Sequence, residues 1–378
     1  MSRVLITGGA GFIGSSLAAE LSRRGHEITV LDNLLPKIHG SDPESSPLLA
    51  VARQHARVVI GDVTTRSDLE GALEGQDVVV HLAAETGTGE SMYQIEHYSR
   101  VNVGGTATLL DILANDPRRT AKKVVVASSR SIYGEGSYEA PGVGRVFPSR
   151  RDERDMLAGR FEVTSPGVDE PLRLIPTAED SKLHPSSVYG ITKQMQEALV
   201  MTVAPTVGMQ GVALRYQNVY GPGQSLTNPY TGILSIFSTL IRQGRPINVF
   251  EDGLESRDFV YIDDVVSATA SAIEDDQANG RVFNVGSGVP TTVIEVVTQL
   301  MAAFGIEVPV EVTGNFRLGD IRHNVADISE IRRALGFVPQ TTFAEGVARF
   351  AEWVTTQEVT GDGYEDSLDE MRRKNLLK

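Results

Sequence analysis

The stretch Arg3–Arg24, RVLITGGAGFIGSSLAAELSRR, decides the fold. Its apolar start, Arg3–Thr7, indicates a strand, and Phe12–Arg24 has apolar residues at helical spacing. The glycines between them satisfy both GxGxxG and GxxGxxG, a pattern that permits a tight turn and lets a pyrophosphate approach the helix N-terminus. We therefore predict a dinucleotide site that includes Gly8, Gly11, Phe12, Ile13 and Gly14.

Asp32 ends the second expected strand, 18 residues after Gly14. A carboxylate at this position can bind both ribose hydroxyls of adenosine, and it repels the 2′-phosphate that distinguishes NADP. Because the next residue is Asn33 rather than Arg, the sequence favours NAD as the cofactor. Asp62 and Val63 follow the third expected strand and are candidate contacts for the adenine ring, although Asp62 could equally cap the following helix.

Short apolar runs alternate with helical patterns through the first half of the chain. The expected strands are Arg3–Thr7, Glu27–Leu31, Arg57–Ile60, Asp77–Leu82, Lys122–Ser128 and Gly211–Arg215. The expected helices are Phe12–Arg24, Arg66–Leu73, Tyr93–Ala114 and Ser187–Val203. Strands that are apolar throughout and separated by helices imply a parallel sheet covered on both faces. We therefore predict an α/β fold with a Rossmann-type doubly wound parallel sheet and a smaller, mixed α/β substrate-binding lobe.

Changes in composition divide the chain. We expect a dinucleotide-binding domain at residues 1–220, joined by residues 258–275, then a second lobe at 221–355 and a charged tail at 356–378. Within the first domain, residues 134–185 are rich in Gly, Pro, Arg and Glu, which indicates an inserted excursion more than a sheet element. The tail is expected to form a peripheral helix or to be partly disordered.

Composition narrows the possible ligands. The net charge is −14 over 378 residues, which argues against general affinity for nucleic acid or anionic membranes. No apolar stretch approaches the roughly 18 residues that a membrane span needs, and the N-terminus lacks a signal peptide, so we expect a cytoplasmic protein. The absence of cysteine excludes disulfides, thiolate catalysis and Cys-ligated metal, and we predict no metal site.

Tyr189 and Lys193, in the sequence YGITK, lie on one face of an expected helix. A free tyrosine has a pKa near about 10, but a lysine one turn away and the positive nicotinamide of NAD⁺ would stabilise the phenolate and lower that value. The strand Lys122–Ser128 leads into SSRSIYG, whose hydroxyls lie at the carboxyl edge of the sheet, where they can hydrogen-bond a sugar oxygen above the nicotinamide. Two non-catalytic interpretations remain at this point. Tyr189 and Lys193 could be a pair on the surface of a helix, and the hydroxyls of SSRSIYG could only cap turns.

Together these motifs resemble the extended short-chain dehydrogenase/reductases, which include enzymes of nucleotide sugars. The resemblance covers residues 2 to about 355 and is carried by GGAGFIG, HLAA at 81–84, SSRSIYG, YGITK, LRYQNVYGPG and SRDFVYIDDV. It implies that Tyr189 is the catalytic base, that Lys193 activates it and binds the cofactor ribose, and that Ser129 hydrogen-bonds the sugar O4. It also assigns NAD contacts to Leu82, Ala83 and Ala84, and substrate contacts to Ser129, Arg130, Asn218, Gln224, Val249, Arg257 and Arg322.

Two features narrow the activity that the resemblance implies. Sugar-nucleotide 4,6-dehydratases carry an acidic pair just after the catalytic hydroxyl residue, whereas this chain has Arg130 and Ser131. The excursion resembles that of bacterial dTDP-L-rhamnose 4-epimerases, which carry two Cys-Pro-x-Cys-Gly knuckles there. This chain has Ala140–Gly144 and Ser165–Val168 in their place, so we predict no zinc.

We therefore predict NAD-dependent epimerisation at C4 of a nucleoside-diphosphate hexose, such as dTDP-L-rhamnose, through a transient 4-keto sugar. A 4-keto sugar-nucleotide reductase that consumes NAD(P)H is the alternative enzyme, and a non-catalytic dinucleotide-binding scaffold or sensor is the alternative of another class. In related enzymes two long helices, here Tyr93–Ala114 and Ser187–Val203, form a four-helix dimer interface, so we expect a homodimer. The apolar residues that suit either that interface or the sheet are Val101, Leu109, Ile112 and Leu113.

Overall fold

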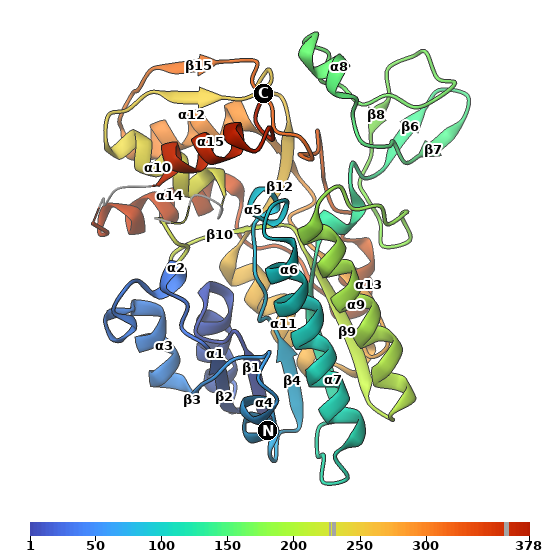
Figure 1. Cartoon of the computed structure of the whole chain (residues 1–378), viewed down its shortest axis with the longest axis vertical. Helices are drawn as coiled ribbons and strands as arrows, with labels where there is room; N and C mark the ends of the chain where they lie inside the picture. The colour runs from blue at the N-terminus through green and yellow to red at the C-terminus, as the bar shows by residue number, and fades with distance from the viewer. Residues whose placement is uncertain (227, 229–231, 359–362) are drawn as a thin grey trace.

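A seven-stranded parallel sheet occupies the lower half of the molecule in Figure 1. The computed structural model describes residues 1–226, 228, 232–358 and 363–378. The strands of this sheet follow the order β13-β9-β5-β4-β1-β2-β3, and every pair is parallel. Their bounds are β1 (Arg3–Thr7), β2 (Glu27–Asp32), β3 (Arg57–Ile60), β4 (Val78–His81), β5 (Lys123–Ser129), β9 (Gln210–Tyr216) and β13 (Val282–Val285). The predicted α/β fold with a Rossmann-type sheet is confirmed.

Helices cover both faces of this sheet. One face carries α1 (Phe12–Arg23), α3 (Pro47–His55) and α11 (Ile262–Glu274), and the other carries α4 (Arg66–Leu73), α6 (Ile95–Tyr98), α7 (Gly105–Asn115) and α9 (Val188–Thr206). Along β1, the fully buried Val4 and Ile6 belong to the first apolar core and the fully buried Leu5 to the second. Because both faces are buried, the strands are apolar runs without polar alternation, which is the pattern that predicted them.

The predicted helix Tyr93–Ala114 is interrupted by a π-helical stretch, Ser99–Gly104. Within this wider turn, the buried Asn102 side chain bridges two neighbouring segments. Its Oδ1 accepts from the Glu85 N–H at 2.7 Å, and its Nδ2 donates to the Glu85 carbonyl at 3.1 Å and to Thr192 Oγ1 at 3.0 Å. These bonds tie the loop after β4 to α9, so the local departure from α-helical geometry has a packing reason.

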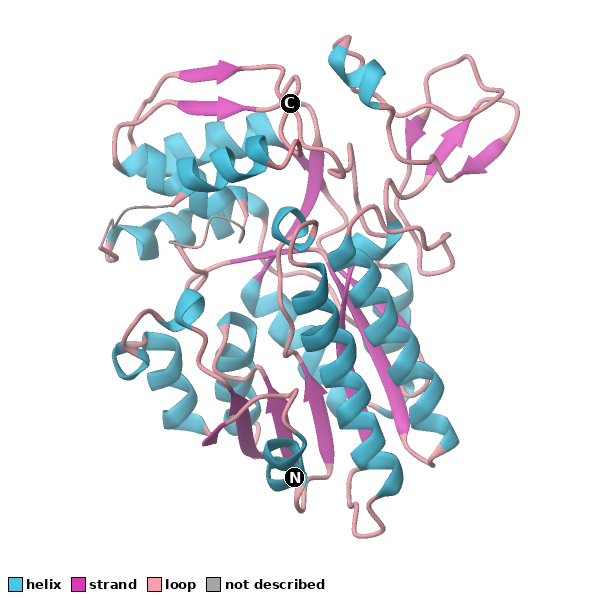
Figure 2. Ribbon diagram, viewed as in Figure 1, coloured by secondary structure: helices cyan, strands magenta, loops and turns pink. Residues whose placement is uncertain are grey.

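A smaller lobe of mixed strands and helices lies above the carboxyl ends of the main sheet (Figures 1 and 2). It has a three-stranded sheet, β10 (Asn218–Tyr220), β12 (Ser256–Tyr261) and β14 (Pro290–Thr292), and a parallel pair, β11 (Ile247–Val249) and β15 (Val310–Val312). Its helices are α10 (Ile233–Arg242), α12 (Val293–Phe304), α14 (Phe343–Thr355) and α15 (Tyr364–Arg373). The shorter helices of the chain are α2 (Pro36–His39), α5 (Thr88–Ser91) and α13 (Ser329–Leu335). No described helix is long and apolar enough to cross a membrane.

The chain returns to the main sheet after residue 220, which corrects the expected division there. β13 pairs with β9, with Val282 beside Ala213 and Val285 beside Tyr216, so this part of the expected second lobe is a sheet strand. The segment expected at 258–275 also returns, because α11 packs on α1. A boundary drawn from composition cannot detect such a crossing, since the apolar run of β13 resembles any other buried strand.

The charged tail forms α15, whose Leu368 and Met371 are buried in the apolar core. The backbone of Lys378 then exchanges hydrogen bonds with Phe316 at 3.0 and 3.1 Å. The described part of the tail is therefore a docked helix rather than a loose end.

Residues 134–185 form a projection at the upper right of Figure 1. We expected no sheet there, but β6 (Tyr138–Ala140) pairs antiparallel with β7 (Gly144–Val146) and β8 (Arg173–Leu174). A short helix, α8 (Glu153–Leu157), follows β7. The strands are only two or three residues long, too short for a recognisable alternation of apolar and polar side chains.

Buried ion pairs anchor this excursion to the smaller lobe. The buried Arg151 donates to both carboxylate oxygens of Glu251 at 2.8 Å, and its Nε lies 3.4 Å from Glu135. Glu162 accepts from two nitrogens of the fully buried Arg322 at 2.6 and 2.9 Å. The apolar cluster beside these pairs contains Met156, Phe161 and Phe316.

Arg151→Met should lower the free energy of unfolding by about 3 kcal/mol, because it leaves buried carboxylates without one of their guanidinium partners. Urea unfolding followed by circular dichroism would measure the loss. Arg160→Met is the matched control, since the ion pair of Arg160 with Asp155 is exposed and its removal should cost at most about 1 kcal/mol. Equal losses in the two variants would show that the buried pairs do not anchor the excursion.

Candidate active site

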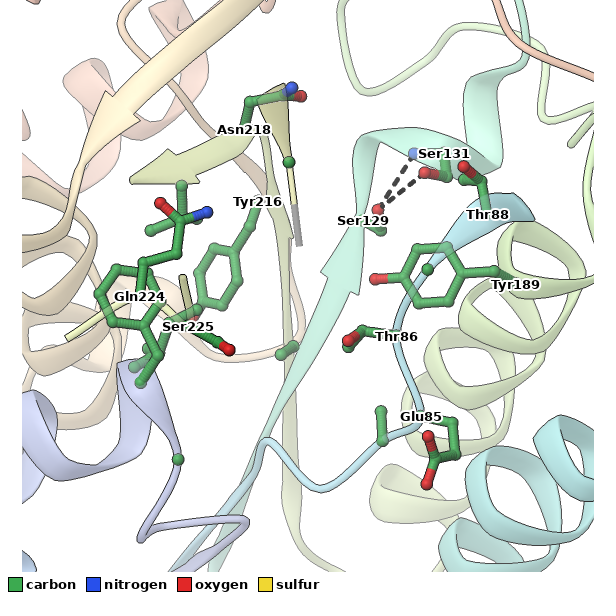
Figure 3. Close-up of a pocket in the computed structure, with 18 of the residues that line it drawn as sticks. Glu85, Thr86, Thr88, Ser129, Ser131, Tyr189, Tyr216, Asn218, Gln224 and Ser225 are labelled. Carbon is green, nitrogen blue, oxygen red and sulfur yellow. Dashed lines mark hydrogen bonds between the residues drawn. The ribbon is translucent and has the colours of Figure 1, made fainter. Parts of the chain in front are cut away.

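A cavity of about 530 Å³ opens at the carboxyl ends of the main-sheet strands, next to the smaller lobe (Figure 3). Doubly wound folds bind their ligands at this edge. The predicted site residues that line it are Gly8, Gly11, Phe12, Ile13, Gly14, Asp32, Asn33, Val63, Leu82, Ala83, Ala84, Ser129, Arg130, Tyr189, Lys193, Asn218, Gln224 and Arg257. Asp62, Val249 and Arg322 were also predicted and do not line it.

The glycine turn packs too closely for side chains. Gly8 has φ +68°, and a Cβ there would lie 2.8 Å from the Ala83 nitrogen. A Cβ on Gly14 would lie 2.5 Å from the Gly8 carbonyl oxygen. α1 begins at Gly11 with no side-chain cap and no acidic residue in its first turn, so its N–H groups remain available to an anion.

Asp32 is held rigidly at the end of β2. Its carboxylate accepts from the Ala10 N–H at 3.0 Å and from the Leu34 N–H at 2.9 Å, and it still lines the cavity. A fixed carboxylate suits ribose hydroxyls, and the uncapped helix start suits a pyrophosphate. The residues present therefore fit a dinucleotide.

Ser129 and Tyr189 meet inside the cavity. Figure 3 shows the Tyr189 hydroxyl directed into it, with Ser129 above and Thr86 below. Ser129 ends β5 and lies beside the Tyr189 hydroxyl (Figure 3), while its Oγ accepts from the Ser131 N–H at 3.2 Å. At the other end of the Tyr189 residue, the backbone N–H donates to Ser91 Oγ at 3.0 Å. The backbone of Tyr189 is thus fixed.

Burial and neighbouring groups act on the pKa of the Tyr189 phenol in opposite directions. Burial raises the pKa of Tyr189, while the hydrogen bond with Ser129 and the positive charge of Arg130 lower it. Lys193, expected to be the activating cation, donates to Gln196 Oε1 at 2.7 Å, and burial lowers the pKa of Lys193 to about 7.

Two guanidinium groups face the cavity without a carboxylate partner within the described part of the chain. The Arg130 Nε donates to Asn218 Oδ1 at 2.5 Å. Arg257 donates only to backbone carbonyls, those of Ser256 at 2.8 Å, Arg322 at 2.9 Å and Ile321 at 2.7 Å. Unneutralised guanidinium forks of this kind bind phosphates well.

Three predicted site residues serve the fold instead. Arg322 is fully buried, and its guanidinium is occupied by Glu162, Glu251 and Asp252, so it is not free to bind a substrate. Val249 is fully buried in β11. The Asp62 carboxylate accepts from the Thr64 N–H at 2.7 Å and from Asn33 Nδ2 at 2.8 Å. These bonds close a turn before α4, whose N-cap is Thr65, so Asp62 does not cap that helix.

Sequence reasoning missed several residues of the cavity wall, chiefly Glu85, Thr86, Thr88, Glu255 and Arg317. Glu85 and Thr86 directly follow HLAA, a signal that could have found them. Arg317 and Arg322 lie in one short stretch, FRLGDIR, and nothing in that stretch says which arginine turns toward the cavity. Among the described residues, no three His, Asp or Glu side chains gather in a way that could hold a metal ion.

Known proteins match this chain over most of its length. A sequence model of the NAD dependent epimerase/dehydratase family matches residues 4–151 and 163–286. The dTDP-L-rhamnose 4-epimerase of Burkholderia thailandensis is 35% identical over 94% of this chain and 95% of its own.

Solved structures agree. The UDP-glucose 4-epimerase of Thermotoga maritima with UDP-glucose has a TM-score of 0.75 at 27% identity, over 94% of this chain and 99% of that chain. MoeE5 in complex with UDP-glucuronic acid and NAD has a TM-score of 0.73 at 29% identity, with the same coverage of 94% and 99%. The family match and the dinucleotide site described above together identify NAD as the cofactor. The chain belongs to the NAD-dependent epimerase/dehydratase family.

Proposed function

We propose that the chain is an NAD-dependent 4-epimerase of a dTDP-6-deoxyhexose, with dTDP-L-rhamnose as the first candidate. The observation that carries the proposal is the position of Ser129 beside the Tyr189 hydroxyl (Figure 3), inside the cavity that the glycine turn also lines. The choice of sugar rests on the 35% identity to the Burkholderia thailandensis enzyme. Arg130 and Ser131, where a 4,6-dehydratase has an acidic pair, favour epimerisation over dehydration.

In the proposed reaction Tyr189 acts as a phenolate and accepts the proton of the sugar C4 hydroxyl, while Ser129 Oγ holds the same oxygen. When bound, NAD supplies the chemistry of hydride removal and return at C4. Thr86 and Thr88, which lie on either side of the Tyr189 ring in Figure 3, present hydroxyls to the remaining sugar oxygens. The 4-keto sugar must turn over between the two halves of the reaction, so that hydride returns to its opposite face.

The nucleoside diphosphate is proposed to lie toward the smaller lobe. Arg257 presents its fork there, and its three backbone hydrogen bonds fix the direction of that fork. Asn218 and Gln224 line the same wall of the cavity. Holding the diphosphate and leaving the sugar free to turn is what an epimerase of this mechanism requires.

We also propose the homodimer expected from the sequence. Ile191 and Met195 are 50% and 44% exposed and lie one turn apart on α9, so they form an apolar stripe. Leu109, Ile112 and Leu113 pack in the core of the chain instead, so they take no part in that surface.

Purified protein given dTDP-L-rhamnose without added cofactor should produce the C4 epimer and reach an equilibrium mixture from either side. Proton NMR of the sugar would identify the product. A 4-keto reductase would act only on a 4-keto sugar with added NAD(P)H, and a scaffold would do neither. UDP-glucose and UDP-glucuronic acid serve as comparison substrates, and a higher kcat/KM for either would overturn the choice of sugar.

Tyr189→Phe should lower kcat by at least about 100-fold, because the general base is lost. NAD content, measured after denaturation of the purified protein, should be unchanged. Tyr138→Phe is the matched control, since its hydroxyl forms no hydrogen bond in the described structure and lies in the excursion. Turnover that survives in the Tyr189 variant would remove this residue as the base.

Met195→Glu should convert the proposed dimer to a monomer, because two such charges would face each other across an apolar contact. Light scattering coupled to size exclusion would measure the mass. Val289→Glu, at a residue that is 58% exposed on another surface, should leave the mass unchanged. A variant mass identical to that of the native protein would place the interface elsewhere.

A further inference from the structure

Residues 376–378 pair antiparallel with residues 316–318, and Leu377 lies directly opposite Arg317, which lines the active-site cavity. We propose that residues 376–378 are a positioning element, which holds the Arg317 guanidinium in the direction needed to bind the nucleotide sugar. This inference rests on the proposed function, which places the nucleoside diphosphate toward the smaller lobe.

Three backbone hydrogen bonds join the two segments. The Phe316 N–H donates to the Lys378 carbonyl at 3.1 Å, and the Lys378 N–H donates to the Phe316 carbonyl at 3.0 Å. On the other side of Arg317, the Leu318 N–H donates to the Leu376 carbonyl at 2.8 Å. The backbone of Arg317 is therefore fixed from both sides by a segment that lies far away in the sequence.

Three neighbours limit the direction of the Arg317 side chain. Leu377 is buried, and the two residues form a non-hydrogen-bonded antiparallel pair, in which facing side chains lie close together. Asp320 Oδ2 accepts from Arg317 Nε at 2.8 Å, and the guanidinium carbon lies 5.7 Å from the centre of the Phe250 ring. The side chain of Arg317 is still 32% exposed, so a ligand in the cavity can reach it.

The end of α15 fixes where residues 376–378 begin. Asn375 has φ +57°, in the left-handed region that asparagine tolerates better than most residues. The Asn375 N–H donates to the Arg372 carbonyl at 3.0 Å, and the Leu376 N–H donates to the Met371 carbonyl at 2.9 Å. These are the two hydrogen bonds of a Schellman motif, which turns the chain away from the helix in a defined direction.

α15 itself contacts both sides of the cavity. Leu368 is buried in the apolar core to which α10 and α14 of the smaller lobe also contribute. Toward the main sheet, the Tyr93 hydroxyl donates to Glu370 Oε2 at 3.3 Å. A Cβ on Gly89, which lines the cavity, would lie 3.4 Å from Met371 Sδ. The helix therefore holds residues 376–378 in a fixed place relative to the cavity.

An arginine that is held in this way loses little freedom when it binds an anion, because its direction is already set in the folded protein. Release of residues 376–378 would free the Arg317 side chain and weaken the binding of a diphosphate. It would leave Ser129, Tyr189 and the glycine turn where they are. The expected change is therefore in KM and not in kcat.

Lys378→Pro tests this, because proline lacks the N–H that donates to Phe316. The KM for the nucleotide sugar and the Kd for dTDP, measured by calorimetry, should each rise about tenfold, with kcat changed less than about twofold. NAD content and the urea unfolding midpoint should match those of the native protein.

Two further variants separate the backbone of Lys378 from its side chain, whose Nζ lies 3.1 Å from Glu153. Lys378→Ala loses the same side chain but keeps the N–H, so it should bind dTDP more tightly than the Pro variant. Glu153→Gln, which removes only the partner of the ammonium, should bind dTDP as the native protein does.

A double variant shows whether the effect passes through Arg317. Arg317→Met should itself weaken dTDP binding, and Lys378→Pro added to it should cause no further loss, because both changes act on one guanidinium. An equal further loss in the Arg317→Met background would overturn the inference. So would an unchanged Kd in Lys378→Pro, or a fall in kcat with an unchanged KM.

The dTDP measurement does not depend on turnover, so it separates this inference from the proposed function. If the native protein epimerises no nucleotide sugar, the proposed function fails. The inference still stands if dTDP binding weakens in Lys378→Pro only while Arg317 is present.

Discussion

The close contact between α9 and the end of β5 sets the position of the whole site. A Cβ on Gly190 would lie 2.6 Å from the Ser131 carbonyl oxygen, so a larger residue would push the helix away. Ser187 Oγ caps the same turn by accepting from the Gly190 N–H at 3.1 Å. Together these contacts hold the first turn of α9 over the strand end, where the Tyr189 hydroxyl reaches Ser129. The chemistry of the pocket thus depends on how closely two backbones approach.

The distribution of arginines explains how an acidic protein can hold an anionic ligand. The net charge of −14 repels anions at long range, so attraction must be local. Arg151, Arg215 and Arg322 are buried and neutralised by carboxylates, and they stabilise the fold. Arg130 and Arg257 are held by an amide and by backbone carbonyls, which fix direction without cancelling charge. These two guanidinium groups therefore give an anion a local partner in the cavity wall.

Features set by neighbouring residues could be predicted from the sequence, and features set by distant contacts could not. The glycine turn, Asp32 and the YGITK helix are local patterns, so the sheet and the Ser129–Tyr189 pair were foreseen. Arg317 lines the cavity and the predicted Arg322 does not. This difference could not be predicted, because the carboxylates that bind Arg322 belong to the excursion and to the segment before β12, far away in the chain. The return of β13 and the π-helical turn around Asn102 likewise depend on partners that no local pattern reveals.

The anchoring of the excursion also decides how the protein can be handled. The anchors include carboxylate–guanidinium pairs, apolar contacts and backbone hydrogen bonds of Thr177, and the chain contains no cysteine. Thiol reagents, which dismantle modules built on cysteine-bound metal, have no cysteine to act on here. Guanidinium salts, by contrast, offer Glu162 and Glu251 a dissolved competitor for their own partners. Urea is thus the cleaner denaturant for this fold.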